Sequence, residues 1–174
     1  MKHQKDKKMR KHLNQLLLSC LFLSTSFLFA QCSSYTPTEK DLPIETLTEL
    51  QTAFPKAAFV ELTKTSTYNV KNEKGQVIGT VLLSSPYSDS IQGFNGPTPL
   101  QIALDKEGKI LEVRVLENEE TPRFLKRVTD AGFLDSWNGK TVKEALDMEV
   151  DAVTGATFSS KSIQNSLKAR LSAE

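Results

Sequence analysis

Two stretches in the middle of the chain alternate between apolar and other residues, and they constrain the fold more than any other feature. Residues 100–104 alternate in this way, and after a turn at 106–109 the pattern resumes over 111–115. A period of two is typical of a β-strand with one buried face, and two such runs around a glycine-containing turn predict a β-hairpin. Another hairpin, which comes first along the chain, is predicted from 67–70 and 76–84, which flank a Glu-Lys-Gly turn.

Helical signals lie before and after these hairpins. Apolar residues at helical spacing predict a helix over Leu42 to Phe54, which Pro55 would end. After the second hairpin, Thr121 followed by Pro122 is typical of a helix start, with threonine as N-cap and proline at the first helical position. We expect that helix to end at the following glycine, which can take the left-handed conformation common at helix ends.

Two further helices are predicted near the C-terminus. Thr141 and Glu144 have the spacing of a capping box at the start of a short helix. Ile163, Leu167 and Leu171 are four residues apart and predict a last helix, which we expect to begin near Ser159. Strands that come first and helices that follow favour an α+β fold, in which a small antiparallel sheet of hairpins is covered by helices.

The charge of the chain is unevenly distributed. The 174 residues carry a formal net charge of +1, which is the sum of a basic start and an acidic remainder. Residues 1–31 hold six basic residues and one acidic residue, which leaves 16 basic and 20 acidic residues, a net charge of −4, for the rest. A domain of that charge lacks the basic surface that nucleic acid binding requires, so we expect no nucleic acid partner.

The positions of histidine and cysteine exclude several kinds of site. The histidines are His3 and His12, and the cysteines are Cys20 and Cys32, so the chain beyond residue 32 contains neither type. That part cannot form a Ser-His-Asp or Cys-His catalytic site, a CxxC redox pair or an iron–sulfur cluster, and no metal site is predicted in it. Any redox function would therefore need an added cofactor.

The first 31 residues have the pattern of an export signal. A basic segment precedes 15 largely apolar residues, 16–30, which are few for a membrane-spanning helix. Cys32 follows and resembles the lipid acceptor of bacterial lipoproteins, although Phe29 and Gln31 depart from the usual motif and Cys20 lies in a better-fitting one with almost no apolar segment before it. An uncleaved membrane anchor and ordinary cleavage after Ala30 are the alternatives, and all three readings place the domain outside the cytoplasm. We divide the chain into a signal or anchor segment (1–31), a linker with an N-terminal helix (32–66) and a C-terminal domain (67–174).

The segment DAVTGATFSS, from Asp151 to Ser160, carries the chemistry. Its residues before the last helix are small or hydroxylated, so backbone amides can approach a ligand, and Gly155 can adopt a positive φ. The N-terminus of a helix favours phosphate through its free N–H groups and its dipole. From spacing alone, a tight turn before a helix N-cap explains the segment as well.

This segment resembles the D-x-x-S/T-G-A-T motif of the FMN-binding domain, which occurs in flavoprotein subunits of sodium-pumping quinone reductases and Rnf-type complexes and in exported single-domain proteins. The resemblance extends from about residue 79 to residue 171 and includes Gly-Phe-Asn-Gly-Pro at 93–97, Glu-Thr-Pro at 120–122 and Trp-Asn-Gly-Lys at 137–140. It implies FMN linked to Thr157 through a phosphoester, installed by a flavin transferase. One departure is Arg123-Phe124-Leu125, where the family often has Gly-Leu-Gly. The residues that the resemblance assigns to the cofactor are Gly93, Gly96, Glu120, Thr121, Asp151, Thr154, Gly155, Ala156, Thr157 and Ser159.

The resemblance implies an exported, membrane-anchored flavoprotein that relays electrons between redox partner proteins at the membrane. FMN would supply the redox chemistry, and the protein would attach and orient it. Two alternatives are an FMN-dependent reductase of a small acceptor and a non-redox binding module at the cell surface. An electron carrier agrees better with a chain of this length than a stand-alone enzyme does.

Overall fold

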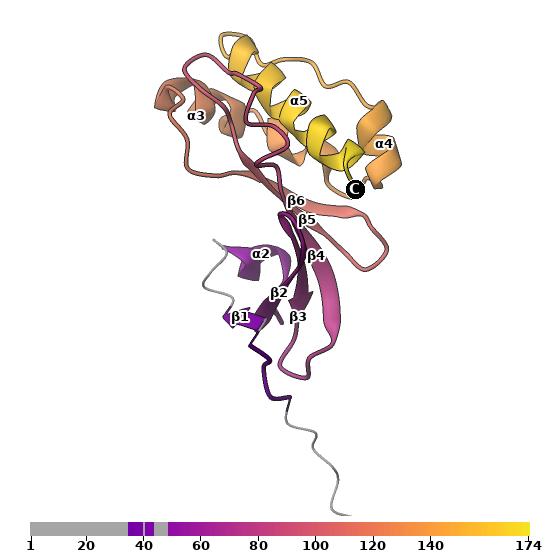
Figure 1. Cartoon of the computed structure of the whole chain (residues 1–174). Helices are drawn as coiled ribbons and strands as arrows, with labels where there is room; N and C mark the ends of the chain where they lie inside the picture. The colour runs from indigo at the N-terminus through magenta and orange to yellow at the C-terminus, as the bar shows by residue number, and fades with distance from the viewer. Residues whose placement is uncertain (1–34, 40, 44–48) are drawn as a thin grey trace, which may run out of the picture. The chain divides into compact units, whose positions relative to one another are not determined.

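The strands of the sheet lie side by side in their order along the chain. The computed structural model describes residues 35–39, 41–43 and 49–174, and in these residues six antiparallel strands form one sheet in the order β1-β2-β3-β4-β5-β6 (Figure 1). Each connection therefore joins neighbouring strands. The strands are β1 (Asp41–Pro43), β2 (Phe59–Lys64), β3 (Thr67–Lys71), β4 (Val77–Leu83), β5 (Leu100–Leu104) and β6 (Ile110–Val115).

Both predicted hairpins are present, and the predicted α+β class is confirmed. β3 pairs with β4 in the register Thr67 to Leu82, and β5 pairs with β6 in the register Leu100 to Val115. The turn of the second hairpin contains Gly108 at φ 78°, a backbone conformation that is open to glycine and costly for most other residues. At both hairpins, the turn residues and the alternation of the strands therefore predict the same structure.

The segment before β3 differs from the helix that its pattern predicts. The helix in this region, α2, covers only Leu50–Ala53, and residues 41–43 form a strand, while residues 44–48 lie outside the described part of the chain. The sequence pattern also did not predict β2, because only Val60 of that strand is buried and the alternation is short. The proposed boundary at residue 66 remains a prediction, although the sheet continues across it.

The centre of the sheet is buried on both faces. Val81 pairs with Ala103 and Leu82 pairs with Ile102, so the two pairs point to opposite faces. Leu82 and Ile102 belong to one apolar cluster, and Val81 and Ala103 belong to another. All five residues of β5 are buried as a result.

Helices cover the first of these faces (Figure 1). Trp137 belongs to the apolar cluster between them and the sheet. Trp137 is completely buried, and its ring meets that of Phe133 edge to face at 5.3 Å between centroids. Trp137 is therefore a core residue. The helices are α3 (Pro122–Asp130), the 3-10 helix η2 (Phe133–Trp137), α4 (Val142–Asp147) and α5 (Thr157–Ser172).

The helix starts confirm two of the sequence predictions and correct two others. The capping box of α4 is present, because the Thr141 hydroxyl accepts from Glu144 N–H and the Glu144 carboxylate accepts from Thr141 N–H. Pro122 begins α3 as predicted, but the Thr121 side chain makes no capping hydrogen bond. The last helix begins at Thr157, two residues before the predicted start, because Ala156 serves as its N-cap without any side-chain bond.

No helix within residues 35–39, 41–43 and 49–174 has both the length and the apolar character needed to cross a membrane. The predicted signal segment and the proposed lipid acceptor Cys32 lie outside these residues.

Candidate functional site

Glu120 joins three segments that are far apart in the sequence. Its carboxylate is buried and accepts from Asn95 N–H at 2.9 Å through Oε1 and from the Ser159 hydroxyl at 2.7 Å through Oε2. The Asn95 side chain in turn donates to the Glu119 carbonyl at 2.7 Å. The loop before β5, the segment before α3 and the first turn of α5 are therefore held together by one carboxylate.

The two glycines of the loop before β5 differ in how closely Glu119 and Glu120 approach them. Gly93 N–H donates to the Gly96 carbonyl at 2.7 Å, which closes a tight turn. A Cβ atom at Gly93 would collide with the Glu120 carboxylate, so a side chain there would displace the group that anchors the loop. At Gly96 the nearest atom to such a Cβ is Glu119 Cβ at 3.7 Å, which is an ordinary contact. Gly93 is thus required by packing, while Gly96 has room.

The turn that leads into α5 has the conformation that the motif predicts. Gly155 has φ 78°, and Ala156 N–H donates to the Val153 carbonyl at 2.9 Å, which makes the turn compact. A Cβ at Gly155 would collide with Nη1 of Arg127, a residue of α3. The positive φ therefore favours glycine at this position, whereas the exposed arginine tip could move to make room for a Cβ.

The hydroxyl groups at the start of α5 divide into inward and outward sets. Ser159, Ser160 and Ser162 are buried, and each of their hydroxyls is hydrogen-bonded within the protein. Thr154 and Thr157 are exposed. Since a hydroxyl must be accessible to be modified, the two threonines are the candidates for covalent attachment, and Ser159 serves to position Glu120.

The outward side of this turn adjoins an aromatic hollow of about 240 Å³. Three phenylalanines line it, with the Phe94 ring 5.0 Å from that of Phe124 and 6.4 Å from that of Phe158, measured between centroids. Phe94 and Phe158 are 58% and 66% exposed, which is unusual for side chains of this size. The remaining lining residues are Gly155, Ala156, Thr157 and Ser159.

These phenylalanines were not identified as site residues from the sequence. One signal for Phe158 was available, because five residues separate it from Ile163, and at 100° per residue this places it about 140° away from the apolar face of α5. A large aromatic side chain outside the buried face of a helix is a candidate for contact with another element or a ligand. Phe94 lay within a predicted loop, and Phe124 was noted only as part of a departure from the family pattern.

The other predicted cofactor residues lie around the same turn. Asp151 is exposed and precedes it, whereas Ala156 is buried and lines the hollow. Thr121 lies at the start of α3, and its carbonyl accepts from Phe124 N–H at 2.8 Å, so it positions a lining residue through its backbone. Gly96 is buried in the loop that carries Phe94. The structure thus brings the predicted residues from all three segments to one place.

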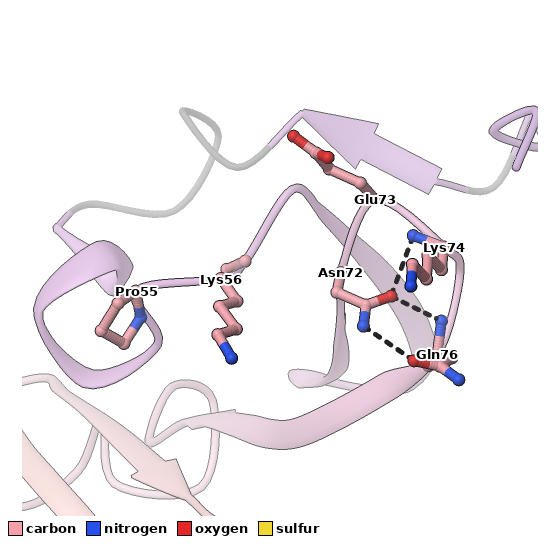
Figure 2. Close-up of a pocket in the computed structure, with 7 residues that line it drawn as sticks. Pro55, Lys56, Asn72, Glu73, Lys74 and Gln76 are labelled. Carbon is pink, nitrogen blue, oxygen red and sulfur yellow. Dashed lines mark hydrogen bonds between the residues drawn. The ribbon is translucent and has the colours of Figure 1, made fainter. Parts of the chain in front are cut away.

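A second hollow, of about 530 Å³, lies at the turn of the first hairpin (Figure 2). Asn72 Oδ1 accepts from the backbone N–H groups of Lys74 and Gln76 at 2.9 and 3.0 Å, and Asn72 Nδ2 donates to Gln76 Oε1 at 3.0 Å (Figure 2). The Asn72 and Gln76 side chains in this hollow therefore stabilise the turn itself. None of the predicted site residues lies there, and we do not assign it to the cofactor.

The ionisable groups with displaced pKa values lie away from the aromatic hollow. The Thr141 backbone N–H and hydroxyl lower the pKa of Glu144, and the hydrogen bond from Lys168 lowers that of Glu149. Both carboxylates have structural partners, so neither is poised for acid–base chemistry. Within the described part of the chain, no cluster of three or more potential metal ligands is present.

Comparison with known families identifies the region that contains this site. Residues 93–172 match the model of the FMN-binding domain, a range that includes the loop at 93–97, Glu120 and the turn before α5. This confirms the resemblance drawn from the sequence motifs.

Named relatives match a similar part of the chain. One is a component of the ion-translocating oxidoreductase complex of Photorhabdus laumondii, 30% identical over an alignment of 92 residues that covers 47% of this chain and 44% of that protein. Another is the component of the same name from Stutzerimonas stutzeri, 32% identical over an alignment of 93 residues that covers 47% of this chain and 41% of that protein. The chain thus matches less than half the length of these relatives.

Among solved structures, the crystal structure of Shewanella oneidensis NqrC aligns with 80% of this chain and 67% of its own, at 21% sequence identity and a TM-score of 0.42. Identity and score at this level carry no argument about the site, so the assignment depends on the sequence matches and on the geometry described above.

Proposed function

Because residues 93–172 of this chain form a member of the FMN-binding domain family, we propose that the protein is an exported flavoprotein that carries FMN on Thr157 and relays electrons outside the cytoplasm. The observation that carries the proposal is the position of Thr157. Its side chain is exposed at the first residue of α5 and lines the aromatic hollow, whereas Ser159, Ser160 and Ser162 are buried and hydrogen-bonded.

The residues around Thr157 fit both halves of FMN. The phosphate suits the N-terminus of α5, where unpaired N–H groups and the helix dipole favour negative charge. The isoalloxazine ring is a large flat aromatic system, and the rings of Phe94, Phe124 and Phe158 offer apolar faces and edges to it. The phenylalanines would exclude water from one side of the ring, and Glu120 would hold the loop of Phe94 in place.

Attachment through a phosphoester requires an activated phosphorus. We propose FAD as the donor and a flavin transferase as the catalyst. Thr157 would supply the oxygen that bonds to the flavin phosphorus as the pyrophosphate P–O bond of the donor breaks. AMP would be the leaving group, and the hydroxyl proton would pass to solvent. No oxidant or reductant is consumed, so the step balances with these reactants alone.

Bound FMN would supply electron transfer in steps of one or two electrons. The protein needs no catalytic dyad for this function, because attachment, orientation and exclusion of water are sufficient. The named relatives are components of an ion-translocating oxidoreductase complex, which supports redox partner proteins at the membrane for this chain as well. The net charge of −4 beyond residue 31 favours a basic surface on such a partner.

Membrane attachment is the second part of the proposal. We propose that a lipid on Cys32 anchors the domain, and the basic and apolar residues before it support export. Cys32→Ser should release the protein from the membrane fraction or stall its precursor. If the variant fractionates and migrates as the wild type does, an uncleaved helix or free secretion replaces the lipid anchor.

The site of attachment is tested with Thr157→Val, which preserves the shape of the side chain and removes its oxygen. After co-expression with a flavin transferase, the wild type should carry one covalent FMN, and Thr157→Val should carry none. Thr154→Val is the matched control, because Thr154 is also exposed and lies in the same turn, and it should retain the modified peptide at Thr157. Peptide mass spectrometry and flavin fluorescence in a denaturing gel measure the outcome.

Two outcomes would contradict the proposal. Covalent flavin on Thr157→Val, or a modified peptide elsewhere, would show that the attachment site is wrong. A wild-type protein without flavin, despite export and an active transferase, would favour the non-redox binding module.

A further inference from the structure

We propose that Arg127 is the cation that pairs with the phosphate of the attached flavin, an inference that rests on the function proposed above. Arg127 extends from α3 to the turn before α5. Its guanidinium covers the place where a Cβ of Gly155 would be, with Nη1 in collision distance of that atom and Cζ at 3.4 Å. A positive charge from a different helix is thereby held against the motif that carries Thr157.

The charge of Arg127 is not neutralised by another side chain within the described part of the chain. The neighbouring Lys126 donates to both oxygens of Asp130 at 2.8 Å, and the buried Arg170 pairs with Glu174 at 3.1 Å. Arg123 lies over the ring of Phe124, 5.1 Å from its centroid. Arg127 has neither an ion pair nor an aromatic ring among the described residues, although it lies against a compact turn.

A phosphodiester on Thr157 is a suitable partner for this group. Such an ester keeps one negative charge at neutral pH, and a guanidinium can donate two parallel hydrogen bonds to its oxygens. Gly155, which the guanidinium contacts, is two residues before Thr157. A phosphate attached to Thr157 would therefore be within a short distance of Arg127 along the turn. The helix N-terminus and the guanidinium would then act on the same anion from two sides.

Lys161 is the competing cation. It lies one turn after Thr157 on the exposed side of α5, where residues four apart share a face of the helix. No hydrogen bond or ring contact within the described residues holds its side chain near the turn. Arg127 is favoured because its guanidinium already lies against Gly155, two residues before Thr157.

The proposed pairing gives a second reason why the motif has glycine at position 155. Gly155 must be glycine for its positive φ, and the absence of a side chain leaves the space that the guanidinium occupies. A residue with a Cβ would push Arg127 away from the phosphate as well as strain the turn.

The test compares the flavin with and without its phosphate. Full-length protein made without a transferase is titrated with FMN and with riboflavin, and binding is followed by flavin fluorescence quenching. Arg127→Gln should weaken the binding of FMN by about tenfold, the scale of a charged hydrogen bond, and leave that of riboflavin unchanged. Arg127→Lys should recover part of the loss. Lys126→Gln, which removes the same charge from the same helix, is the matched control and should change neither.

A second measurement follows covalent attachment. With purified transferase and FAD, the initial rate of flavin incorporation, measured by intact mass, should fall by about tenfold in Arg127→Gln and remain at the wild-type level in Lys126→Gln. Urea unfolding of both variants should match the wild type, which separates charge pairing from a general loss of structure.

The outcomes separate this inference from the proposed function. The role of Arg127 is wrong if the Arg127→Gln variant takes up flavin and binds FMN as the wild type does. It is also wrong if the substitution weakens the binding of riboflavin as much as that of FMN. The flavoprotein assignment stands in both cases. If Lys161→Gln shows the phosphate-specific loss instead, Lys161 is the pairing cation. If the wild type neither binds FMN nor acquires flavin, both proposals are wrong.

Discussion

The two faces of the central sheet differ in how they are covered and in what they support. On one face, α3, η2, α4 and α5 pack against β4, β5 and β6 around fourteen buried apolar residues. On the other face, α2 packs against β2 to β5 around six such residues among those described. Every predicted cofactor residue belongs to the helical face or to the loops at its edge.

The more extensively covered face is the one that positions the candidate site. The hollow is lined by residues from the loop before β5, from α3 and from α5, and these elements are held in place by the larger cluster and by Glu120. The hairpin β3–β4 and α2 contribute no lining residue to the hollow. Their role at the site is indirect, through the shared strands β4 and β5.

Arg170 links α5, on the helical face, to the hairpin β3–β4 through polar contacts. It lies near the end of α5, is completely buried, and donates from Nε to the Leu83 carbonyl at 2.9 Å and from Nη2 to the Thr67 hydroxyl at 2.5 Å. Its guanidinium also lies over the ring of Tyr87, 4.8 Å from the centroid. The helix that begins at the candidate site is therefore fastened at its other end to β3 and β4.

The largest effect is expected from the core of the helical face. Trp137→Ala should lower the free energy of unfolding by about 3–5 kcal/mol, because it empties the centre of that core. Phe54→Ala, in the smaller cluster, is the matched control with a loss of similar size. Urea unfolding measures both. Flavin incorporation into the folded protein should fall in Trp137→Ala and persist in Phe54→Ala, and an equal fall in both would contradict the separation of the two faces.

An intermediate effect is expected at Arg170, which joins α5 to β3 and β4. Arg170→Met keeps most of the volume and removes the hydrogen bonds to Leu83 and Thr67, which should cost about 1.5–3 kcal/mol because the donor is charged. Hydrogen exchange should then increase in β3 and at the end of α5, and less at the start of α5. Unchanged exchange in β3 would show that the apolar contacts alone join the two parts.

The smallest effect is expected at the cap of α4. Thr141→Ala should cost about 1 kcal/mol at neutral pH, and Thr141→Ser should recover most of it. The lowered pKa of Glu144 means that its carboxylate stabilises the folded state above the ordinary glutamate pKa, and this contribution is lost as the pH falls through the lowered pKa. The difference between wild type and Thr141→Ala in urea unfolding should therefore shrink at acid pH, and a constant difference would exclude the carboxylate from the cap.

Local patterns were sufficient for several elements of this fold. The two hairpins, Pro122 at the start of α3 and the capping box at Thr141 follow from residues within a few positions of one another, and the structure contains all of them. The helix predicted over 42–54 was wrong for residues 42 and 43, which belong to strand β1, since that pairing depends on β2 rather than on local spacing. The start of α5 at Thr157 was also missed, because its N-cap Ala156 lacks a capping side chain.

The sequence by itself determined the position of the motif and the kinds of chemistry that the domain can perform. The absence of histidine and cysteine beyond residue 32 excluded several catalytic and redox sites, and the order of small and hydroxylated residues identified the turn before α5. These properties depend on which residues are present and on their immediate neighbours, so they can be read without a fold.

Only the tertiary structure decided which side chains act together. The bond between Ser159 and Glu120 joins residues 39 positions apart, and the one between Asn95 and Glu120 joins residues 25 positions apart. The same packing turned the serines of α5 inward, left Thr157 outward beside the phenylalanines, and placed Arg127 against Gly155. Contacts of this range arise from the packing of helices on a shared sheet, and neither periodicity nor spacing along the chain encodes them.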